Sequence, residues 1–359
     1  MSLKHNIARI YGTPAIVVDL DIVERNIARV QDLLDQAGIT NRPHIKTHKS
    51  PELAKLQRAA GARGITCQKL GEAEVFADAG FDDILITYNI FGAQKEARMA
   101  GLLQRNPVTL TVAADNPVTL AGLSRAGVMA ERPVGVVIEC DTGRKRAGVE
   151  TPRDAIHLAI ESAAMPGLTF RGLMFYPPED GWEASQRFLD ETLNGLKENG
   201  LAADIISTGG SPNLLHVGRL KGTTEHRAGT YIFNDRMQMK AGVATLRDCA
   251  LTVCATVVSR GGEERGIIDA GSKTLTSDTG GLDGHGSILE HPEARIARFA
   301  EEHGFLDLSA CNHRPEVGDV VSIIPNHVCV VVNMVDQLIA VRGDQIIGEI
   351  AVAARGRIG

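Results

Sequence analysis

Residues 64–87 read GITCQKLGEAEVFADAGFDDILIT, which is a short β-branched run, an amphipathic segment and a second apolar run. We expect strands at 64–67 and 83–87, because these runs are too short for helices, and a helix at 71–77 between them. A strand, a helix and a strand in this order form the repeating unit of a parallel sheet that is covered by helices.

The same alternation continues on both sides of this stretch. About eight such units predict an α/β fold, a closed (β/α)8 barrel over residues 22–245, with functional residues at the carboxyl ends of its strands. An open doubly wound sheet is the alternative. The further predicted strands lie at 44–47, 108–113, 134–139, 168–176, 204–208 and 225–233, and the further predicted helices at 22–37, 51–56, 93–103, 117–126, 153–164 and 182–199.

The pattern changes after residue 250, where short apolar runs are separated by turns without intervening helices. We therefore predict a C-terminal, mostly antiparallel β domain at 246–359. A β-branched run at 15–20 has no helix before it, so residues 1–21 are expected to contribute a strand to that domain. The predicted strands of the β domain lie at 250–258, 264–270, 317–324, 328–334, 337–341 and 346–354.

The composition argues against several classes of protein. With 38 Lys+Arg against 44 Asp+Glu the net charge is -6, which gives no general attraction for nucleic acid. No apolar run approaches the roughly 18–20 residues of a membrane span, and residues 1–10 do not read as a secretory signal. The six cysteines lie far apart and are expected to be reduced thiols. We therefore expect a cytoplasmic protein with no nucleic-acid or membrane partner.

A lysine lies between two histidines in residues 42–49, RPHIKTHK. If this segment is extended, His44, Lys46 and His48 point to the same face. Partial burial favours the neutral amine, which can form a Schiff base with a carbonyl group. The alternative is a solvated lysine at a junction of strand and loop.

Two late strands end in small residues and hydroxyls, at 205–211 (IISTGGS) and 227–231 (RAGTY). Backbone N–H groups without side chains in the way suit a phosphate, and late strands of a (β/α)8 barrel often hold one. Taken singly, each is equally an ordinary turn. Arg146 and Tyr176, at other strand ends, are candidate cofactor contacts, although they can also be a solvated basic turn and a rim residue.

A His-x-Cys pair occurs in residues 324–329, IPNHVC. An extended segment would place His327 and Cys329 on one face, as two metal ligands require. Two protein ligands leave positions open for water or substrate. The alternative is a buried cysteine and a hydrogen-bonded histidine in a β core.

Together these motifs resemble the fold-type III pyridoxal-phosphate (PLP) enzymes, the alanine-racemase-like class, and within it the D-threonine aldolase and D-serine dehydratase family. The resemblance covers nearly the whole chain. It depends mainly on RPHIKTHK and on the distant His-x-Cys pair, and it extends to residues 13–15 (TPA), 67–69 (CQK), 146–149 (RAGV), 229–231 (GTY) and 269–271 (DAG).

The resemblance implies a PLP barrel with a β domain, usually a homodimer, in which Lys46 holds PLP covalently and acts as a base. It implies a divalent cation, zinc or manganese and possibly magnesium, beside the cofactor. The implied site residues are Lys46 and Tyr176 for catalysis, Arg146 and Tyr176 at the cofactor ring, Thr208, Gly209, Gly210, Gly229 and Thr230 around its phosphate, and His327 and Cys329 at the cation.

The resemblance also implies a lyase that acts on D-3-hydroxy amino acids. A D-threonine aldolase breaks the Cα–Cβ bond and releases glycine and an aldehyde, whereas a dehydratase of D-serine or D-3-hydroxyaspartate releases an α-keto acid and ammonia. Aldolases of the family carry a histidine shortly after the barrel tyrosine, but Pro177 and Pro178 follow Tyr176 here, and cysteine as the second ligand is typical of dehydratases. Residues 229–235 and 278–286 resemble bacterial D-threonine aldolases, and the aldolase is the preferred prediction.

Two other classes are less consistent with the sequence. A non-catalytic PLP carrier of the same barrel type usually lacks both the β domain and the His-x-Cys pair. An amino-acid racemase would need a tyrosine from the β domain, yet no tyrosine follows Tyr231.

Overall fold

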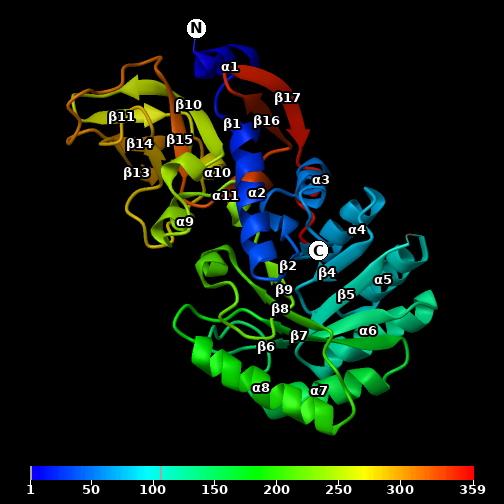
Figure 1. Ribbon diagram of the computed structural model, residues 1–359. Helices are drawn as coiled ribbons and strands as arrows, with labels where there is room; N and C mark the ends of the chain where they lie inside the picture. The colour runs from blue at the N-terminus through cyan, green and yellow to red at the C-terminus, as the bar shows by residue number, and fades with distance from the viewer. Residues whose placement is uncertain (1, 106) are drawn as a thin grey trace. The chain divides into compact units, whose positions relative to one another are not determined.

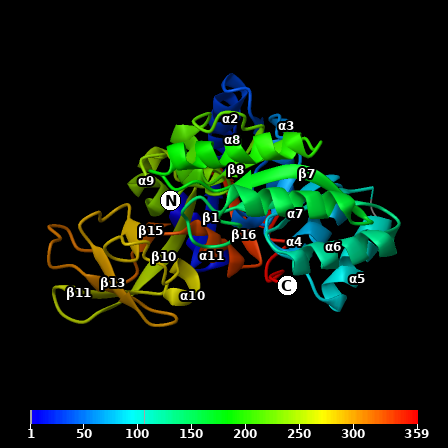
Figure 2. The ribbon, with the colours of Figure 1, turned by 90° about the horizontal axis from the view of Figure 1, so that it is seen from below.

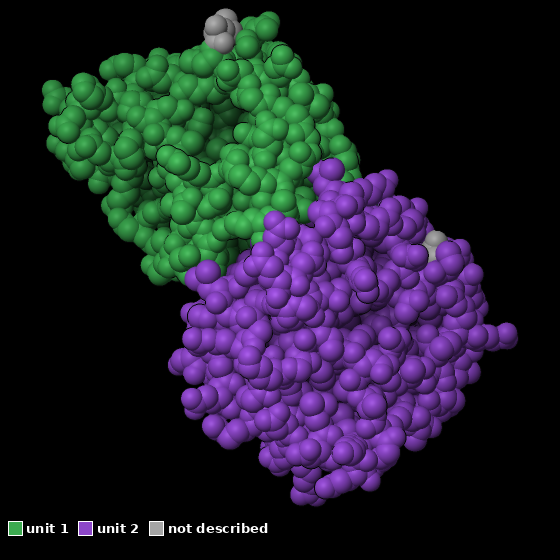
Figure 3. All heavy atoms as spheres, viewed as in Figure 1, with its two compact units in different colours: residues 1–29, 47–53, 230–355 green, residues 30–46, 54–229, 356–359 purple. Residues whose placement is uncertain are grey.

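The computed structural model describes residues 2–105 and 107–359, and the chain divides into two compact units (Figure 3). The β unit consists of Met1–Arg29, Thr47–Leu53 and Thr230–Arg355. The barrel unit consists of Val30–Lys46, Ala54–Gly229 and Gly356–Gly359. Each unit contains one large sheet.

The sheet of the barrel unit has eight parallel strands in the order β2-β9-β8-β7-β6-β5-β4-β3 (Figure 1). His44, just after β2, pairs in parallel with Thr66 of β3, so that strand pairing joins the two ends of the sheet. The predicted (β/α)8 barrel is therefore confirmed, and the open sheet is wrong. The strands are β2 (Thr40–Asn41), β3 (Ile65–Cys67), β4 (Asp83–Ile86), β5 (Thr109–Ala114), β6 (Val134–Cys140), β7 (Leu168–Phe175), β8 (Ile205–Gly209) and β9 (Glu225–Arg227).

Local sequence explains these elements. Every residue of β6 is buried, as expected for a parallel strand. The helices α6 and α7 begin after Asn116 and Thr151, whose side chains accept hydrogen bonds from backbone N–H groups of the first turn. In both ribbon views α7 and α8 lie side by side along the sheet (Figures 1 and 2). The helices are α2 (Leu20–Gln36), α3 (Pro51–Ala59), α4 (Leu70–Asp78), α5 (Ala93–Arg105), α6 (Pro117–Ala130), α7 (Pro152–Ala164), α8 (Trp182–Glu198) and the 3-10 helix η2 (Ser211–His216).

The β unit contains a nine-stranded sheet in which almost all neighbours are antiparallel, which confirms the predicted β domain. Its order is β11-β14-β13-β12-β15-β10-β1-β16-β17, and β11 also pairs with β10, so six of these strands close into a small barrel. The elements are α1 (Leu3–Tyr11), β1 (Ala15–Asp19), η3 (Thr230–Ile232), α9 (Arg236–Lys240), η4 (Leu246–Asp248), β10 (Leu251–Arg260), β11 (Arg265–Ile268), α10 (Ser272–Leu275), β12 (Gly286–Ile288), β13 (Arg295–Phe299), β14 (Gly304–Asp307), β15 (Val320–Pro325), α11 (Val328–Asn333), β16 (Gln337–Arg342) and β17 (Gln345–Ala351).

The expected extended segment around Lys46 is wrong beyond its first residue. Only His44 makes a strand bridge, and a 3-10 turn, η1 (Ile45–Thr47), follows it. Because the chain turns here, His44, Lys46 and His48 do not alternate along one strand face. Pro43 favours extended backbone only before itself, and does not prevent a turn after it.

The expected strand at 328–334 is also wrong, because α11 occupies this position and His327 is its N-cap. The buried residues of the helix are Val328, Val331 and Val332, which have the i, i+3, i+4 spacing of one helical face. Val330 is exposed on the other face. Packing of this face outweighs the modest preference of valine for strands.

All six cysteines are free thiols, as predicted. Cys329 differs from the other five because it alone is not buried. None of the helices within residues 2–105 and 107–359 is both long and apolar enough to span a membrane.

A buried ion pair connects strands of the barrel. Glu225 on β9 is 4% exposed and accepts hydrogen bonds from Arg42 Nε at 2.6 Å and from Ser207 Oγ at 2.5 Å. We expect Glu225→Ala to destabilise the fold by about 3–5 kcal/mol, because it leaves the buried Arg42 without this partner. A thermal denaturation curve should shift downwards by roughly 10 °C. The control is Asp204→Ala, which removes an exposed ion pair with Arg171 (3.7 Å) and should shift the curve little; equal shifts would contradict the prediction.

Candidate active site

Lys46 differs from its neighbours in exposure. Every other residue of the segment 41–50 is buried, whereas Lys46 is partly exposed. The backbone of Lys46 is held in place by the β-bridge between His44 and Thr66 and by the η1 turn. An accessible amine on a fixed and otherwise buried segment suits a covalent link to a carbonyl ligand.

His44 is buried within the barrel unit, close to positive charges. Burial lowers its pKa well below the usual range, and the charges of Lys46, Arg227 and Arg146 lower it further. The ring is therefore neutral. Its Nδ1 accepts the Lys46 backbone N–H at 3.5 Å, so that Nε2 carries the proton and donates it to Gln68 Oε1 at 3.2 Å.

Tyr176 directly follows β7 and lies against the glycine turn at the end of β8. A Cβ on Gly210 would lie 2.3 Å from Tyr176 Cε2, and Gly210 has a φ of +102°, so both space and backbone require glycine here. The guanidinium carbons of Arg144 and Arg146 lie 4.2 and 5.4 Å from the centre of the tyrosine ring. The structure thus brings together three predicted site residues, Arg146, Tyr176 and Gly210.

Two charged residues that were not among the predicted site residues lie beside this group. Arg227 on β9 is buried and donates to Ser207 Oγ and, at 3.1 Å, to the Phe175 carbonyl; burial lowers its pKa to about 10. Glu139 on β6 is 3.7 Å from Arg146, and burial raises its pKa. Arg227 begins the segment 227–231 but was not predicted as a site residue, and no local motif marks Glu139.

The turns predicted to hold a phosphate are formed mostly by buried backbone. Thr208 and Gly209 end β8, and Gly229 donates its backbone N–H to Ser211 Oγ at 3.3 Å. Gly229 is the last residue of this part of the barrel unit, and Thr230, also buried, begins the next part of the β unit. The side-chain-free backbone beside Tyr176 and the positive charge of Arg146 fit a phosphorylated aromatic cofactor.

In the β unit, Asp235 is a further candidate residue that the sequence analysis missed. Its carboxylate is fully buried, and Oδ2 accepts hydrogen bonds from His327 Nδ1 at 3.2 Å and from the Val328 backbone at 3.1 Å. Burial lowers the pKa of His327, but hydrogen bonds and charges from Asp235 and Cys329 outweigh it and raise that pKa to about 10. Thr47 Oγ1 lies 3.3 Å from Cys329 Sγ.

These contacts fit a cation site in which His327 binds through Nε2. A metal-binding histidine almost always donates its other ring N–H to a carboxylate or carbonyl, as His327 does to Asp235. An imidazole nitrogen and a thiolate sulfur are ligands that zinc prefers. Among the described residues, no group of three or more His, Cys, Asp or Glu side chains is arranged to hold a metal, so the chain would supply two ligands.

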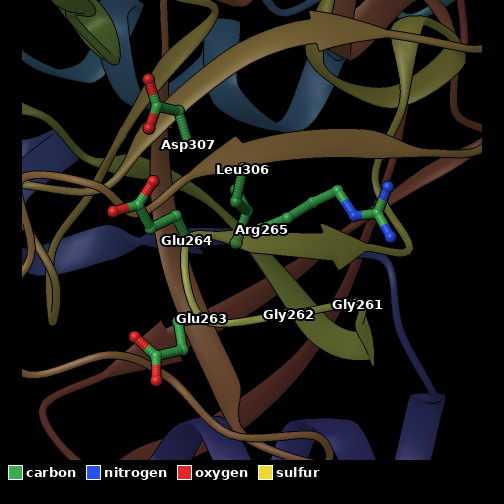
Figure 4. Close-up of a pocket in the computed structure, with 7 residues that line it drawn as sticks. All are labelled: Gly261, Gly262, Glu263, Glu264, Arg265, Leu306 and Asp307. Atoms are coloured by element: carbon green, nitrogen blue, oxygen red, sulfur yellow. The ribbon is translucent and has the colours of Figure 1, made fainter.

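A separate hollow in the β unit contains none of the predicted site residues. It has a volume of about 620 Å³ and is lined by the hairpin between β10 and β11 together with Leu306 and Asp307. Figure 4 shows the carboxylates of Glu263, Glu264 and Asp307 on one side and the Arg265 guanidinium on the other. We assign it no role.

Comparison with known proteins agrees with this architecture. A family model described as "Alanine racemase, N-terminal domain" matches residues 18–237, and one described as "Putative serine dehydratase domain" matches residues 250–341. Fold and site therefore define a chain of the alanine-racemase-like class.

Individual relatives indicate the family within this class to which the chain belongs. A D-threonine aldolase from Arthrobacter sp is 33% identical over 360 residues, which cover 96% of this chain and 93% of the relative. A D-threo-3-hydroxyaspartate dehydratase from Delftia sp. (strain HT23) is 33% identical over 349 residues, covering 88% and 90%. The crystal structure of D-threonine aldolase from Filomicrobium marinum has a TM-score of 0.88 at 31% identity, covering 97% and 96%. The chain belongs to the family of D-threonine aldolases and D-serine dehydratases, and the predicted resemblance is confirmed.

Proposed function

We propose that the protein is a PLP-dependent lyase of D-3-hydroxy amino acids, and that it is a D-threonine aldolase that releases glycine and an aldehyde. The observation that carries the proposal is the match to the Arthrobacter D-threonine aldolase over 96% of the chain. The contacts around Lys46 and Tyr176 support it, because they fit a covalently held aromatic cofactor.

Each barrel residue has a separate task in this proposal. PLP, when bound, withdraws electrons from the Cα of an amino acid and so makes the bonds at that carbon labile. Lys46 would hold the cofactor through Nζ and, when its amine is released, accept a proton. His44 is neutral and holds its proton on Nε2 toward Gln68, so it stabilises the lysine segment and does not compete for substrate protons. Arg146 and Tyr176 would border the cofactor ring, and the turn at Thr208–Gly210 with Gly229 and Thr230 would surround the phosphate.

His327 and Cys329 would hold a divalent cation, which when bound polarises an oxygen ligand as a Lewis acid. The thiolate favours zinc, whereas magnesium prefers oxygen ligands, and manganese is intermediate in this respect. Thr47, which contacts the Cys329 thiol, directly follows Lys46 in the chain. Asp235 would orient the His327 ring.

A dehydratase is the second candidate, and two observations favour it. The second proposed ligand is a cysteine, and Tyr176 is followed by Pro177 and Pro178 without a nearby histidine that could accept the β-hydroxyl proton. The Delftia relative, at 33% identity, is a D-threo-3-hydroxyaspartate dehydratase. The same residues would then support loss of the hydroxyl group, with an α-keto acid and ammonia as products.

Product analysis distinguishes the two. The purified protein, with PLP and zinc or manganese added, is incubated separately with D-threonine, D-serine and D-threo-3-hydroxyaspartate. We expect equal amounts of glycine and acetaldehyde from D-threonine, at least about 100-fold faster than from L-threonine, which corresponds to ~2.7 kcal/mol of discrimination. Keto acid and ammonia from D-serine or the hydroxyaspartate, without glycine from D-threonine, would instead establish the dehydratase. D-alanine, which lacks a β-hydroxyl group, is the control.

We propose a cytoplasmic homodimer, supported by the free thiols and by the resemblance to the family. The proposed domain limits are 22–245 for the barrel and 246–359 for the β domain. The pairing of β1 with β10 and β16 supports the contribution of a strand from residues 1–21.

A further inference from the structure

A histidine that the proposed function does not use lies behind the glycine turn. His226 on β9 is 3% exposed and is paired in register with Thr208 of β8. Its Nδ1 lies 3.1 Å from Thr208 Oγ1, and its Nε2 lies 3.3 Å from the Gly210 carbonyl oxygen. One imidazole therefore contacts both ends of the three-residue turn.

The contacts determine which nitrogen carries the proton. A carbonyl oxygen can only accept, so His226 Nε2 must donate to Gly210. Nδ1 of the neutral ring is then an acceptor, and the Thr208 hydroxyl donates to it. Burial and the charge of Arg227 lower the pKa of His226 to about 4, so the ring is neutral near neutral pH.

This arrangement changes the role of Thr208. Because its hydroxyl proton is directed to His226, it is not available to a phosphate. Successive strand residues point to opposite faces, and Ser207 is the one that bonds to Glu225 and Arg227. Thr208 therefore belongs to the support behind the turn and not to the surface that receives the ligand.

The turn is also held through its backbone. The Gly210 N–H donates to the Arg227 carbonyl at 2.7 Å, and a Cβ on Gly209 would lie 2.8 Å from the same oxygen. Backbone bonds from β9 thus hold one side of the turn, and the Asn213 N–H also donates to the Gly210 carbonyl at 3.1 Å. Among the described residues, only the His226 ring bonds both the Gly210 carbonyl and the Thr208 hydroxyl.

We propose that His226 is a positioning residue, which holds the turn at Thr208–Gly210 in the conformation that receives the phosphate of PLP. This inference rests on the proposed function. It predicts a specific defect: loss of the His226 bonds should weaken binding of the phosphate group and not binding of the aldehyde to Lys46.

Trp182 provides a probe of this region. It is the single tryptophan of the chain and lines a small cavity together with Thr208, Asn213 and His226. Cofactor binding at the turn should therefore change its fluorescence, which gives a binding signal that does not depend on turnover.

The test compares PLP with pyridoxal, which has the same aldehyde but no phosphate, on cofactor-free protein. His226→Gln can keep a donor near the position of Nε2, whereas His226→Asn can keep only the bond near Nδ1, and His226→Leu keeps neither. We expect PLP affinity to fall about 10-fold or more in the Asn and Leu variants, and about 3-fold or less in the Gln variant. Pyridoxal affinity should change less than about 2-fold in all three, because pyridoxal has no phosphate for the turn to receive. A 2-fold change is smaller than the contribution of a typical hydrogen bond.

The control is His216→Phe, which changes another histidine of the same cavity, whose ring centre lies 5.5 Å from that of Trp182. It should keep both affinities. Equal losses for PLP and pyridoxal, or unchanged PLP affinity in the Leu variant, would overturn the role of His226 while leaving the proposed function intact. If the unaltered protein binds neither compound, the proposed function fails and this inference fails with it.

Discussion

We expect Lys46→Ala to remove the visible absorption band of lysine-bound PLP and to lower turnover by about 10³-fold or more. The substitution removes both the amine that holds the cofactor and the proposed base, and general acid–base catalysis alone commonly contributes 10²–10⁴-fold. The partial exposure of Lys46 on a buried segment indicates that its loss should not unfold the barrel. Absorption spectra and initial rates on D-threonine are measured on the same samples.

A second measurement identifies the modified residue directly. Borohydride treatment of the PLP-loaded protein should fix the cofactor to one lysine, and peptide mass mapping should find it on Lys46. Lys55, exposed on α3, is the matched control, and Lys55→Ala should keep the band and the rate. A full visible band in the Lys46→Ala protein, or the label on a different lysine, would disprove the assignment.

The barrel could be predicted from the sequence because each unit carries its own signals. In residues 64–87 the short apolar runs and the helical segment between them have distinct periods, and the structure has β3, α4 and β4 in these places. The β domain was also predicted, from the short apolar runs after residue 250, but its strands β12, β13 and β14 were not predicted and the predicted strand at 328–334 is the helix α11. Parallel strands buried on both faces, such as β6, need continuous apolar sequence, which is easily recognised.

Short segments around the site were predicted less well. Residues 44–47 and 328–334 are too short for the period of their apolar residues to distinguish a strand from a helix. In the structure a 3-10 turn follows His44 in the first segment, and the helix α11 occupies the second. The prediction that His327 and Cys329 bind one cation therefore rests on the family resemblance and not on strand geometry. Their close approach arises across the first turn of a helix and not along one face of a strand.

Residues whose role depends on register could not be found from the sequence. His226 faces Thr208 and Arg227 faces Gly209 only because β8 and β9 pair in one particular alignment. Asp235 contacts His327 although the two residues lie 92 positions apart in the chain. Nothing in the local sequence at 225–227 or at 235 encodes these distances, so the strand pairing and tertiary contacts had to be known first.

Removal of the proposed cation should stop turnover without releasing PLP. We expect chelator-treated protein, His327→Ala and Cys329→Ala each to lose about 10³-fold or more in rate on D-threonine, since a Lewis acid supplies several kcal/mol and ~4 kcal/mol corresponds to 10³-fold. The visible band of lysine-bound PLP should remain, because its proposed contacts, apart from Thr230, lie in the barrel unit. Elemental analysis should find about one metal per unaltered chain and a metal content near zero in both variants.

Graded variants separate a ligand from a residue that orients one. Asp235→Asn keeps a side-chain oxygen near His327 Nδ1 but removes the charge, and should cost about 10–100-fold in metal affinity, as is typical of the partners of metal ligands. Cys311→Ala, which removes a buried thiol of the same β unit, should retain the metal and the rate. Zinc should restore chelated protein at lower concentration than magnesium, because thiolate is a poor ligand for magnesium. Full turnover in protein shown to be metal-free would refute His327 and Cys329 as ligands, whereas an Asp235→Asn effect as large as that of His327→Ala would make Asp235 a third ligand.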